Sequence, residues 1–162
     1  MADKIRNKVT TTERKSDCEL VVTRSFNAPA QIVFEAWTKP DLMQRWWTPK
    51  SFGITFVSCE MDVRTGGDYK FVFSHPAFEK PMEFFGKYIE VIPNSRLVWT
   101  NAENAEGAVT TVTFMEKNGQ TMMVMHDLYP TKEALDTAIE SGSTGAPDEQ
   151  YRELDLLLAG DL

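Results

Sequence analysis

Apolar and polar residues alternate through most of this chain, which predicts a protein rich in β-strands. The first alternation covers 19–26, where one face of a strand is formed by Leu20, Val22, Arg24 and Phe26. The same period of two predicts six further strands, at 52–63, 67–75, 82–92, 95–101, 108–116 and 120–129. Because short turns separate these six strands, they predict an antiparallel meander.

Two short helices are predicted between the first strand and the meander. Asn27 is a suitable N-cap, and Pro29 lies where a first helical turn tolerates proline. Pro40 ends this helix and Asp41 begins the next one. Helical spacing gives apolar faces formed by Ile32, Val33, Ala36 and Trp37 in the first helix and by Leu42, Met43, Trp46 and Trp47 in the second.

The period becomes helical again near the C-terminus. Thr131 can cap a helix whose apolar stripe is formed by Ala134, Leu135, Ala138 and Ile139. Gly142 to Gly145 interrupts the pattern, and Pro147 is an acceptable first residue for a second segment. We expect one C-terminal helix with a glycine break at its middle. The break is either a hinge that opens a cavity or an ordinary linker.

The Asn118-Gly119 turn determines which side chains of the last two strands share a face. A two-residue type I′ turn pairs Lys117 with Gln120, whereas a three-residue turn with a glycine bulge pairs Glu116 with Gln120. The bulged register separates apolar from polar residues better, so we expect that register. It places on one apolar face Val112, Phe114, Met122 and Val124, with His126 at the end of that face.

Length and charge narrow the range of functions. The 162 residues are expected to form one domain over 18–162, preceded by a flexible extension at 1–17. The net charge of −7 argues against nucleic acid and anionic membranes as partners. No segment suggests membrane insertion or a signal peptide, so we expect a cytoplasmic protein. Residues 132–162 have a net charge of −6, which is typical of a solvated helix face or of a recognition surface for a basic partner.

The sequence has no strong motif for catalysis or metal binding. His75 and His126 lack a known ligand spacing, and neither a nucleophile elbow nor a phosphate-binding loop occurs, so we expect no metal and no cofactor. Cys18 and Cys59 are expected to be reduced, with Cys59 in the core. His126 is a weak catalytic candidate. It either orients a ligand or acts as a general base, or it bonds a backbone carbonyl and closes the corner.

Several short motifs occur in an order that resembles a known family. They are ELVVTRSFNAPAQIVFEAWTKPDLMQRWWTP at 19–49, EMDVR at 60–64 followed by Gly66-Gly67, GKYIEV at 86–91, RLVWT at 96–100 and HDLYP at 126–130. Together they resemble the activator of heat-shock-protein-90 ATPase homologue-like family of the START/SRPBCC superfamily, whose fold is shared with the birch pollen allergen. The resemblance implies an α+β helix-grip fold. Its curved antiparallel sheet has about seven strands and wraps around the C-terminal helix.

The resemblance also implies a ligand cavity between the sheet and the last helix. The residues expected to line it are Phe71, Phe73, Phe84, Tyr88, Trp99, Val112, Phe114, Met122, Val124, His126, Leu135 and Ile139. We therefore expect a binding module for an apolar or amphipathic small molecule such as a lipid, which needs no catalytic group.

Two other functions stay open at this point, because one fold hosts many functions. The first is a protein-binding, chaperone-ATPase-activator-like role in stress responses. The named eukaryotic activators also use a separate N-terminal domain, which this chain is expected to be too short to include. The second is a polyketide cyclase/dehydratase-like enzyme, in which His126 would transfer a proton with help from Tyr88 and Glu90.

Overall fold

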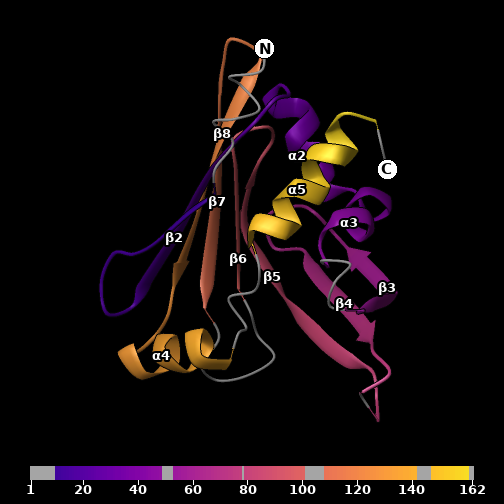
Figure 1. Cartoon of the computed structure of the whole chain (residues 1–162), viewed down its shortest axis with the longest axis vertical. Coiled ribbons are helices and arrows are strands. Elements are labelled where there is room, and N and C mark those ends of the chain that lie inside the picture. The colour runs from indigo at the N-terminus through magenta and orange to yellow at the C-terminus, as the bar shows by residue number, and fades with distance from the viewer. Residues whose placement is uncertain (1–9, 49–52, 78, 101–107, 142–146, 161–162) are drawn as a thin grey trace.

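A single antiparallel sheet of eight strands forms most of the protein in the computed structural model (Figure 1). The structure describes residues 10–48, 53–77, 79–100, 108–141 and 147–160. The strands follow the order β1-β2-β8-β7-β6-β5-β4-β3. Their bounds are β1 Thr11–Arg14, β2 Glu19–Phe26, β3 Thr55–Met61, β4 Asp68–Ser74, β5 Met82–Ile92, β6 Arg96–Thr100, β7 Val109–Lys117 and β8 Gln120–Leu128.

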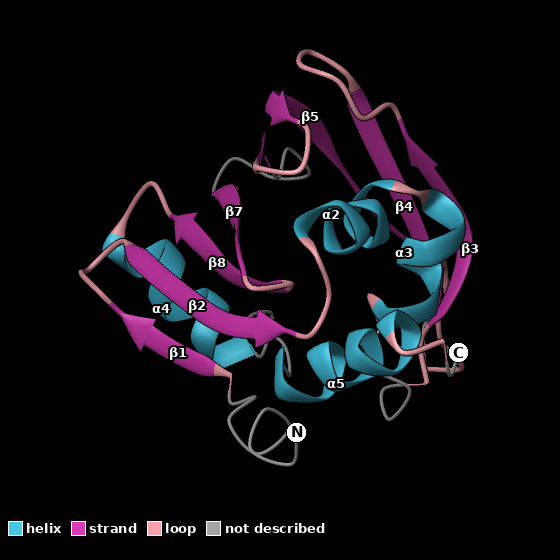
Figure 2. Ribbon diagram, turned by 90° about the horizontal axis from the view of Figure 1, so that it is seen from above, coloured by secondary structure: helices cyan, strands magenta, loops and turns pink. Residues whose placement is uncertain are grey.

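The sheet curves around three of the four helices in the described residues. Seen from above, α2 (Ala30–Thr38) and α3 (Pro40–Trp46) lie inside the curve, and α5 (Pro147–Leu158) runs across its open side (Figure 2). The fourth helix, α4 (Lys132–Ser141), lies across the lower end of the sheet in Figure 1. This arrangement confirms the predicted α+β class and the curved antiparallel meander.

The strand that the sequence prediction missed is β1. It pairs antiparallel with β2, with Thr11 opposite Thr23 and Arg14 opposite Leu20. The flexible extension predicted for 1–17 is therefore wrong for residues 11–14, whereas residues 1–9 lie outside the described residues. The four side chains of β1 are all exposed, so the strand has no apolar alternation by which it could be recognised. Backbone pairing adds it to the sheet, and Arg14 at its end forms a 2.7 Å ion pair with Asp136 of α4.

Tryptophans from α2 and α3 form the centre of the core. Trp37 packs on Trp46 with ring centroids 4.8 Å apart, and both side chains are almost fully buried. The Trp46 Nε1 group donates a hydrogen bond to the Ala36 carbonyl at 2.9 Å, so its polar atom is satisfied inside the core. Tyr151 of α5 stacks near both rings, at 6.4 Å from Trp37 and 6.2 Å from Trp46. The three helices and the sheet thus share one aromatic core.

The start of α2 differs from the sequence prediction. Pro29 is the N-cap, and its side chain makes no capping hydrogen bond. The Glu116 carboxylate of β7 instead accepts a hydrogen bond from the Ala30 amide at 2.8 Å, which satisfies one of the free N–H groups of the first turn. The buried face also differs, since Phe34 is 8% exposed and Ile32 is 42% exposed. The predicted Asn27 cap and the inward Ile32 are therefore wrong.

The C-terminal region forms two helices, α4 and α5, rather than one broken helix. Thr131 caps α4 as predicted, because its Oγ1 accepts a hydrogen bond from the Ala134 amide at 3.0 Å. Pro147 is the first residue of α5, as predicted. Gly142 to Gly145 lies outside the described residues, so the hinge at this position stays a prediction.

The register of the last hairpin is the main correction to the sequence analysis. Lys117 pairs with Gln120, so Asn118 and Gly119 form a two-residue turn. Both turn residues have positive φ, at 55° and 76°, which is the backbone of the type I′ turn that Asn-Gly favours. The expected bulged register is therefore wrong, and this one-residue difference moves every side chain of β8 to the face opposite the expected one.

Candidate functional site

An arginine lies on the apolar, concave face of β2. Arg24 lies on the same face of the strand as Leu20, Val22 and Phe26, and its side chain is 2% exposed. Its Nη1 and Nη2 groups donate hydrogen bonds of 2.9 and 2.7 Å to the two carboxylate oxygens of Asp155 on α5. A third, longer bond of 3.4 Å joins Nη1 to the Tyr151 carbonyl. This bidentate ion pair holds α5 against the sheet.

A half-buried carboxyl group lies further along the same face. Asp127 of β8 pairs with Leu20 of β2 and with Thr110 of β7. The Thr110 hydroxyl donates a 2.6 Å hydrogen bond to the Asp127 carboxylate. Burial raises the pKa of Asp127 above its ordinary value, while the Thr110 bond and the neighbouring His126 act in the opposite direction. The concave face therefore carries a carboxyl group that holds its proton more tightly than usual.

Tyr151 of α5 connects these two polar groups. Its ring packs edge-on against Phe26 at 5.7 Å, and its hydroxyl lies 3.7 Å from the sulfur of Met125. Burial raises the pKa of Tyr151, Asp127 raises it further, and Arg24 lowers it, so both charged groups lie within electrostatic reach of the phenol. We call Arg24, Thr110, Asp127, Tyr151 and Asp155 the concave polar cluster.

Several side chains of the concave face beside this cluster are not fully covered. Met125 and Asp127 on β8 and Trp99 on β6 are half-buried, although their strand neighbours Met123 and Leu97 are fully buried. The face is therefore covered more completely at Met123 and Leu97 than at Met125 and Trp99. The concave polar cluster borders this less covered part.

The residues predicted to line a cavity divide into two groups. The inward group is buried or half-buried in the core and comprises Phe71, Phe73, Phe84, Tyr88, Trp99, Val112 and Phe114. The outward group lies on the other face of β8 and comprises Met122, Val124 and His126. On α4, Leu135 is fully buried, whereas Ile139 is 41% exposed. The type I′ turn explains the outward group, because Met123 and Met125 take the inward positions instead.

His126 lies on the outer face, where it pairs with Glu19. Its Nε2 is 2.7 Å from a carboxylate oxygen of Glu19, and both side chains are about one-third exposed. This hydrogen bond, together with a second one from Ser16, lowers the pKa of Glu19. The expected position of His126 at the end of the concave face is wrong, so it cannot act on a ligand held there.

The other polar candidates do not converge on one point. Tyr88 is buried beside Tyr69, and burial raises the pKa of its phenol. Glu90 pairs at 3.1 Å with Arg96 at the protein surface.

Burial raises the pKa of the Cys59 thiol to about 11, and Asp41 adds to this shift. Cys59 and Cys18 are both free thiols, as expected.

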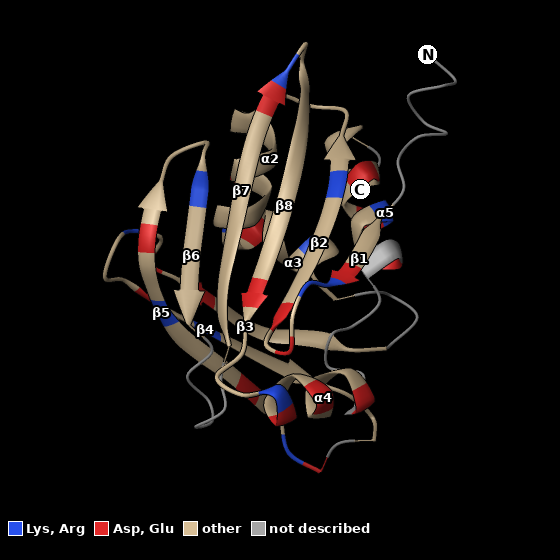
Figure 3. Cartoon of the chain, turned by 90° about the vertical axis from the view of Figure 1, so that its left-hand side faces the viewer, with Lys and Arg blue, Asp and Glu red and all other residues tan. Residues whose placement is uncertain are grey.

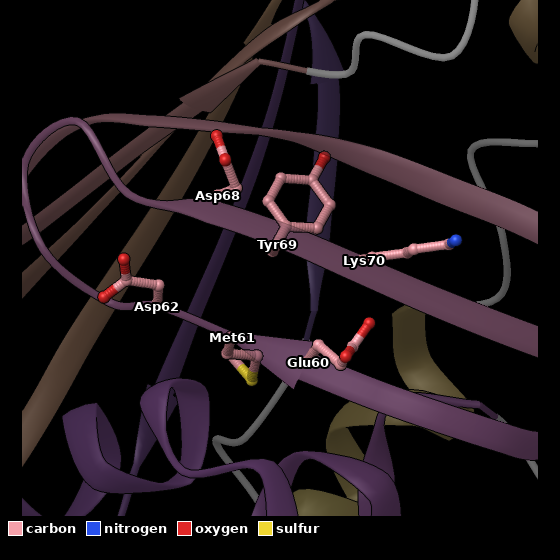
Figure 4. Close-up of a pocket in the computed structure, with 6 residues that line it drawn as sticks. All are labelled: Glu60, Met61, Asp62, Asp68, Tyr69 and Lys70. Carbon is pink, nitrogen blue, oxygen red and sulfur yellow. The ribbon is translucent and has the colours of Figure 1, made fainter.

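An open pocket of about 300 Å³ lies away from the concave polar cluster, between β3 and β4 (Figure 4). The residues that line it are Glu60, Met61, Asp62, Asp68, Tyr69 and Lys70. Charged neighbours already pair with two of its carboxylates, since Arg64 bonds Asp62 and Lys87 bonds Asp68. Within the described residues, no group of three or more His, Cys, Asp or Glu side chains is arranged to hold a metal ion.

The outer face of the sheet has few charges along the middle of β7 and β8, as Figure 3 shows. Met115 and Met122 pair across these strands and are 51% and 40% exposed. No helix in the described part of the chain is long and apolar enough to cross a membrane.

The sequence analysis did not select the concave polar cluster as a site. One signal was available, because Arg24 interrupts the apolar alternation of its strand. Asp127 becomes an inward residue only in the type I′ register, so the wrong register hid it, whereas Thr110 shares the face of Val112 in either register. Asp155 lies 131 residues from Arg24 in sequence, and no local pattern relates the two.

Solved structures share this fold over nearly the whole chain. A crystal structure from Rhodobacter sphaeroides is 25% identical, with a TM-score of 0.84, covering 94% of this chain and 99% of that chain. A solution structure from Staphylococcus epidermidis is 24% identical, with a TM-score of 0.76 and coverage of 94% and 95%. An AHSA1-like protein from Aeromonas hydrophila is 19% identical, with a TM-score of 0.67 and coverage of 88% and 95%.

The sequence itself identifies the family. No curated protein matches this chain. The family described as Activator of Hsp90 ATPase homolog 1-like protein matches residues 27–159, which is most of the chain. The match includes the whole of α5. This match and the shared fold confirm the resemblance found in the sequence motifs, and the chain therefore belongs to the Activator of Hsp90 ATPase homolog 1-like family.

Proposed function

We propose that this protein is a binding module for an apolar or amphipathic small molecule. The ligand lies against the concave face of the sheet, under the C-terminal helices and beside the concave polar cluster. The observation that carries the proposal is the presence of the charged residues Arg24 and Asp127 on a face that is mostly apolar and aromatic. Small-molecule sites are mostly apolar and have a few polar groups that orient the ligand.

The half-buried side chains support the same position. Met125 and Trp99 face the interior and keep part of their surface uncovered, which leaves apolar contact area for a ligand. Burying apolar surface stabilises a complex by roughly 25 cal/mol per Å² before the costs of association are counted. A ligand that covers Met125 and reaches the concave polar cluster would combine apolar contact with a polar anchor.

Native mass spectrometry with a ligand panel tests this function. The panel contains fatty acids, sterols, flavonoids and polycyclic aromatic ketones, and we expect a one-to-one complex with at least one class. Met125→Trp places a larger side chain at the position proposed for the ligand and should weaken that complex at least tenfold. Met122→Trp is the matched control on the outer face and should leave binding unchanged. A panel without complexes, or equal loss in both folded variants, would contradict the proposal.

A protein-binding role is the second candidate, and the exposed pair Met115 and Met122 favours it. Exposed apolar residues that lie side by side are typical of docking surfaces. An ATPase assay with a purified chaperone of the heat-shock-protein-90 type tests this role. Stimulation that disappears in Met115→Ser/Met122→Ser would support it, and an unchanged ATPase rate with the wild-type protein would exclude it.

A further inference from the structure

One edge of the Arg24 guanidinium has no partner in the described part of the protein. The group is planar and carries five N–H donors in a fixed arrangement. Asp155 and the Tyr151 carbonyl accept three hydrogen bonds from Nη1 and Nη2. No described residue accepts a hydrogen bond from Nε, although the side chain is 2% exposed. A buried donor without an acceptor is costly, so this edge suits an acceptor on a bound molecule.

A second buried donor in the same core lacks an acceptor. The indole Nε1 of Trp37 makes no hydrogen bond to any described residue, and the residue is 1% exposed. Its ring packs against Trp99 at 6.1 Å and against Tyr151, whose carbonyl touches Arg24. Tyr151 therefore contacts both residues that hold unused donors. Both of these unused groups are donors.

The charges around Arg24 favour an uncharged ligand over an anion. The carboxylate of Asp155 already balances the guanidinium charge at 2.7 Å. Asp127 and Arg24 both lie near enough to the Tyr151 phenol to change its pKa, in opposite directions. An added carboxylate would meet the carboxylate of Asp155 and would lose its hydration without a free positive charge in return. A carbonyl oxygen can accept the same hydrogen bond without that cost.

We propose that Arg24 is the ligand-orienting residue of this site, and that its Nε–H edge binds the acceptor oxygen of an uncharged apolar molecule such as an aromatic ketone. The proposal rests on the proposed binding function and specifies its ligand class. The Asp155 ion pair holds the guanidinium in place, so the donor is oriented before the ligand arrives. The aromatic residues around Trp37 provide the apolar surface that covers the rest of the molecule.

Three naphthalenes of similar size test the ligand class. They are 2-acetylnaphthalene, 2-ethylnaphthalene and 2-naphthoate, which carry a neutral acceptor, no acceptor and an anionic acceptor. We expect 2-acetylnaphthalene to bind about tenfold more tightly than each of the other two at neutral pH, the factor expected for one good hydrogen bond to a charged donor. Tighter binding of 2-naphthoate, or equal binding of all three, would overturn the proposal.

The Nε–Hε resonance of Arg24 in a proton–nitrogen NMR spectrum tests the contact directly. We expect this resonance to shift when 2-acetylnaphthalene binds and to shift much less with 2-ethylnaphthalene. Arg24→Lys keeps a positive charge for Asp155 but removes the Nε donor. It should abolish the preference for 2-acetylnaphthalene over 2-ethylnaphthalene, measured as the ratio of their affinities for the same variant. If the variant fails to fold, the shift of the Arg24 Nε–Hε resonance in the wild-type protein still tests the contact.

The outcomes separate this inference from the proposed function. Binding of panel compounds without a shift at Arg24 Hε would overturn the inference and leave the binding function in place. The absence of binding by every compound would contradict both.

Discussion

Met122 and Met123 are neighbours in the chain, yet they lie on opposite faces of the sheet, 40% and 0% exposed. This difference gives a matched pair of variants that tests the register of β7 and β8. Met123→Ala should lower the free energy of unfolding by about 2–5 kcal/mol, because it leaves a cavity in the core. Met122→Ala should change it by less than about 1 kcal/mol. Urea unfolding checks both values, and a larger loss at Met122 would contradict the type I′ register.

The ion pair between Arg24 and Asp155 should stabilise the position of α5. Asp155→Ala leaves the buried guanidinium unpaired and should cost roughly 2–4 kcal/mol, somewhat less than a fully buried pair because Asp155 is 22% exposed. The double variant Arg24→Met/Asp155→Leu should be more stable than Asp155→Ala, since no unpaired charge remains. Unfolding curves of the three proteins measure this. A double variant that is no more stable than Asp155→Ala would show that the unpaired guanidinium does not cause the loss.

The raised pKa of Asp127 predicts a stability that falls as pH rises. The folded protein holds this proton more tightly than the unfolded chain, whose ordinary value is 3.8. Between these two pKa values the folded state binds more protons, so the free energy of unfolding decreases with increasing pH. Asp127→Asn removes this contribution to the pH dependence of stability. The stability of the variant relative to the wild type should therefore increase from pH 3.8 upward and level off above the folded pKa. A wild type that gains on the variant with rising pH would contradict this assignment.

Glu19 should show the opposite behaviour. The hydrogen bond from His126, with a smaller contribution from Ser16, lowers its pKa below the ordinary 4.5. The stabilisation from this pair is present above pH 4.5 and is lost as pH falls through the lowered value. Carboxyl NMR titration measures the pKa directly. In His126→Leu, the Glu19 pKa should move back toward 4.5, and an unchanged midpoint would show that His126 is not the cause.

The type and order of most elements could be predicted from the sequence, because burial of one face imposes a simple period. The seven expected strands, the cap at Thr131 and the start of α5 at Pro147 follow from local chemistry. β1 lacked such a signal, since all its side chains are exposed. Its position depends on backbone pairing with β2 and on the ion pair between Arg14 and the distant Asp136, and neither has a local sequence pattern.

The candidate site was harder to predict, because it depends on register and on distant partners. The expected register treated polar Thr121 as outward and apolar Met122 as inward. Thr121 is in fact buried, because its hydroxyl donates a 2.7 Å hydrogen bond to the Ala28 carbonyl, and Met122 is exposed. A satisfied hydroxyl can occupy a core position at little cost. Polarity alone therefore gave the wrong face, and His126 was placed inward for the same reason.

The methionine methyl groups provide the most direct test of the central claim, that a ligand binds on the concave face. Met125 faces the interior beside Tyr151, whereas Met115 and Met122 lie on the outer face. In a carbon–proton spectrum of methyl-labelled protein, a bound aromatic ketone should shift the Met125 signal and leave Met115 and Met122 unchanged. Shifts confined to Met115 and Met122, or no shift at any methionine across the panel, would contradict ligand binding on the concave face.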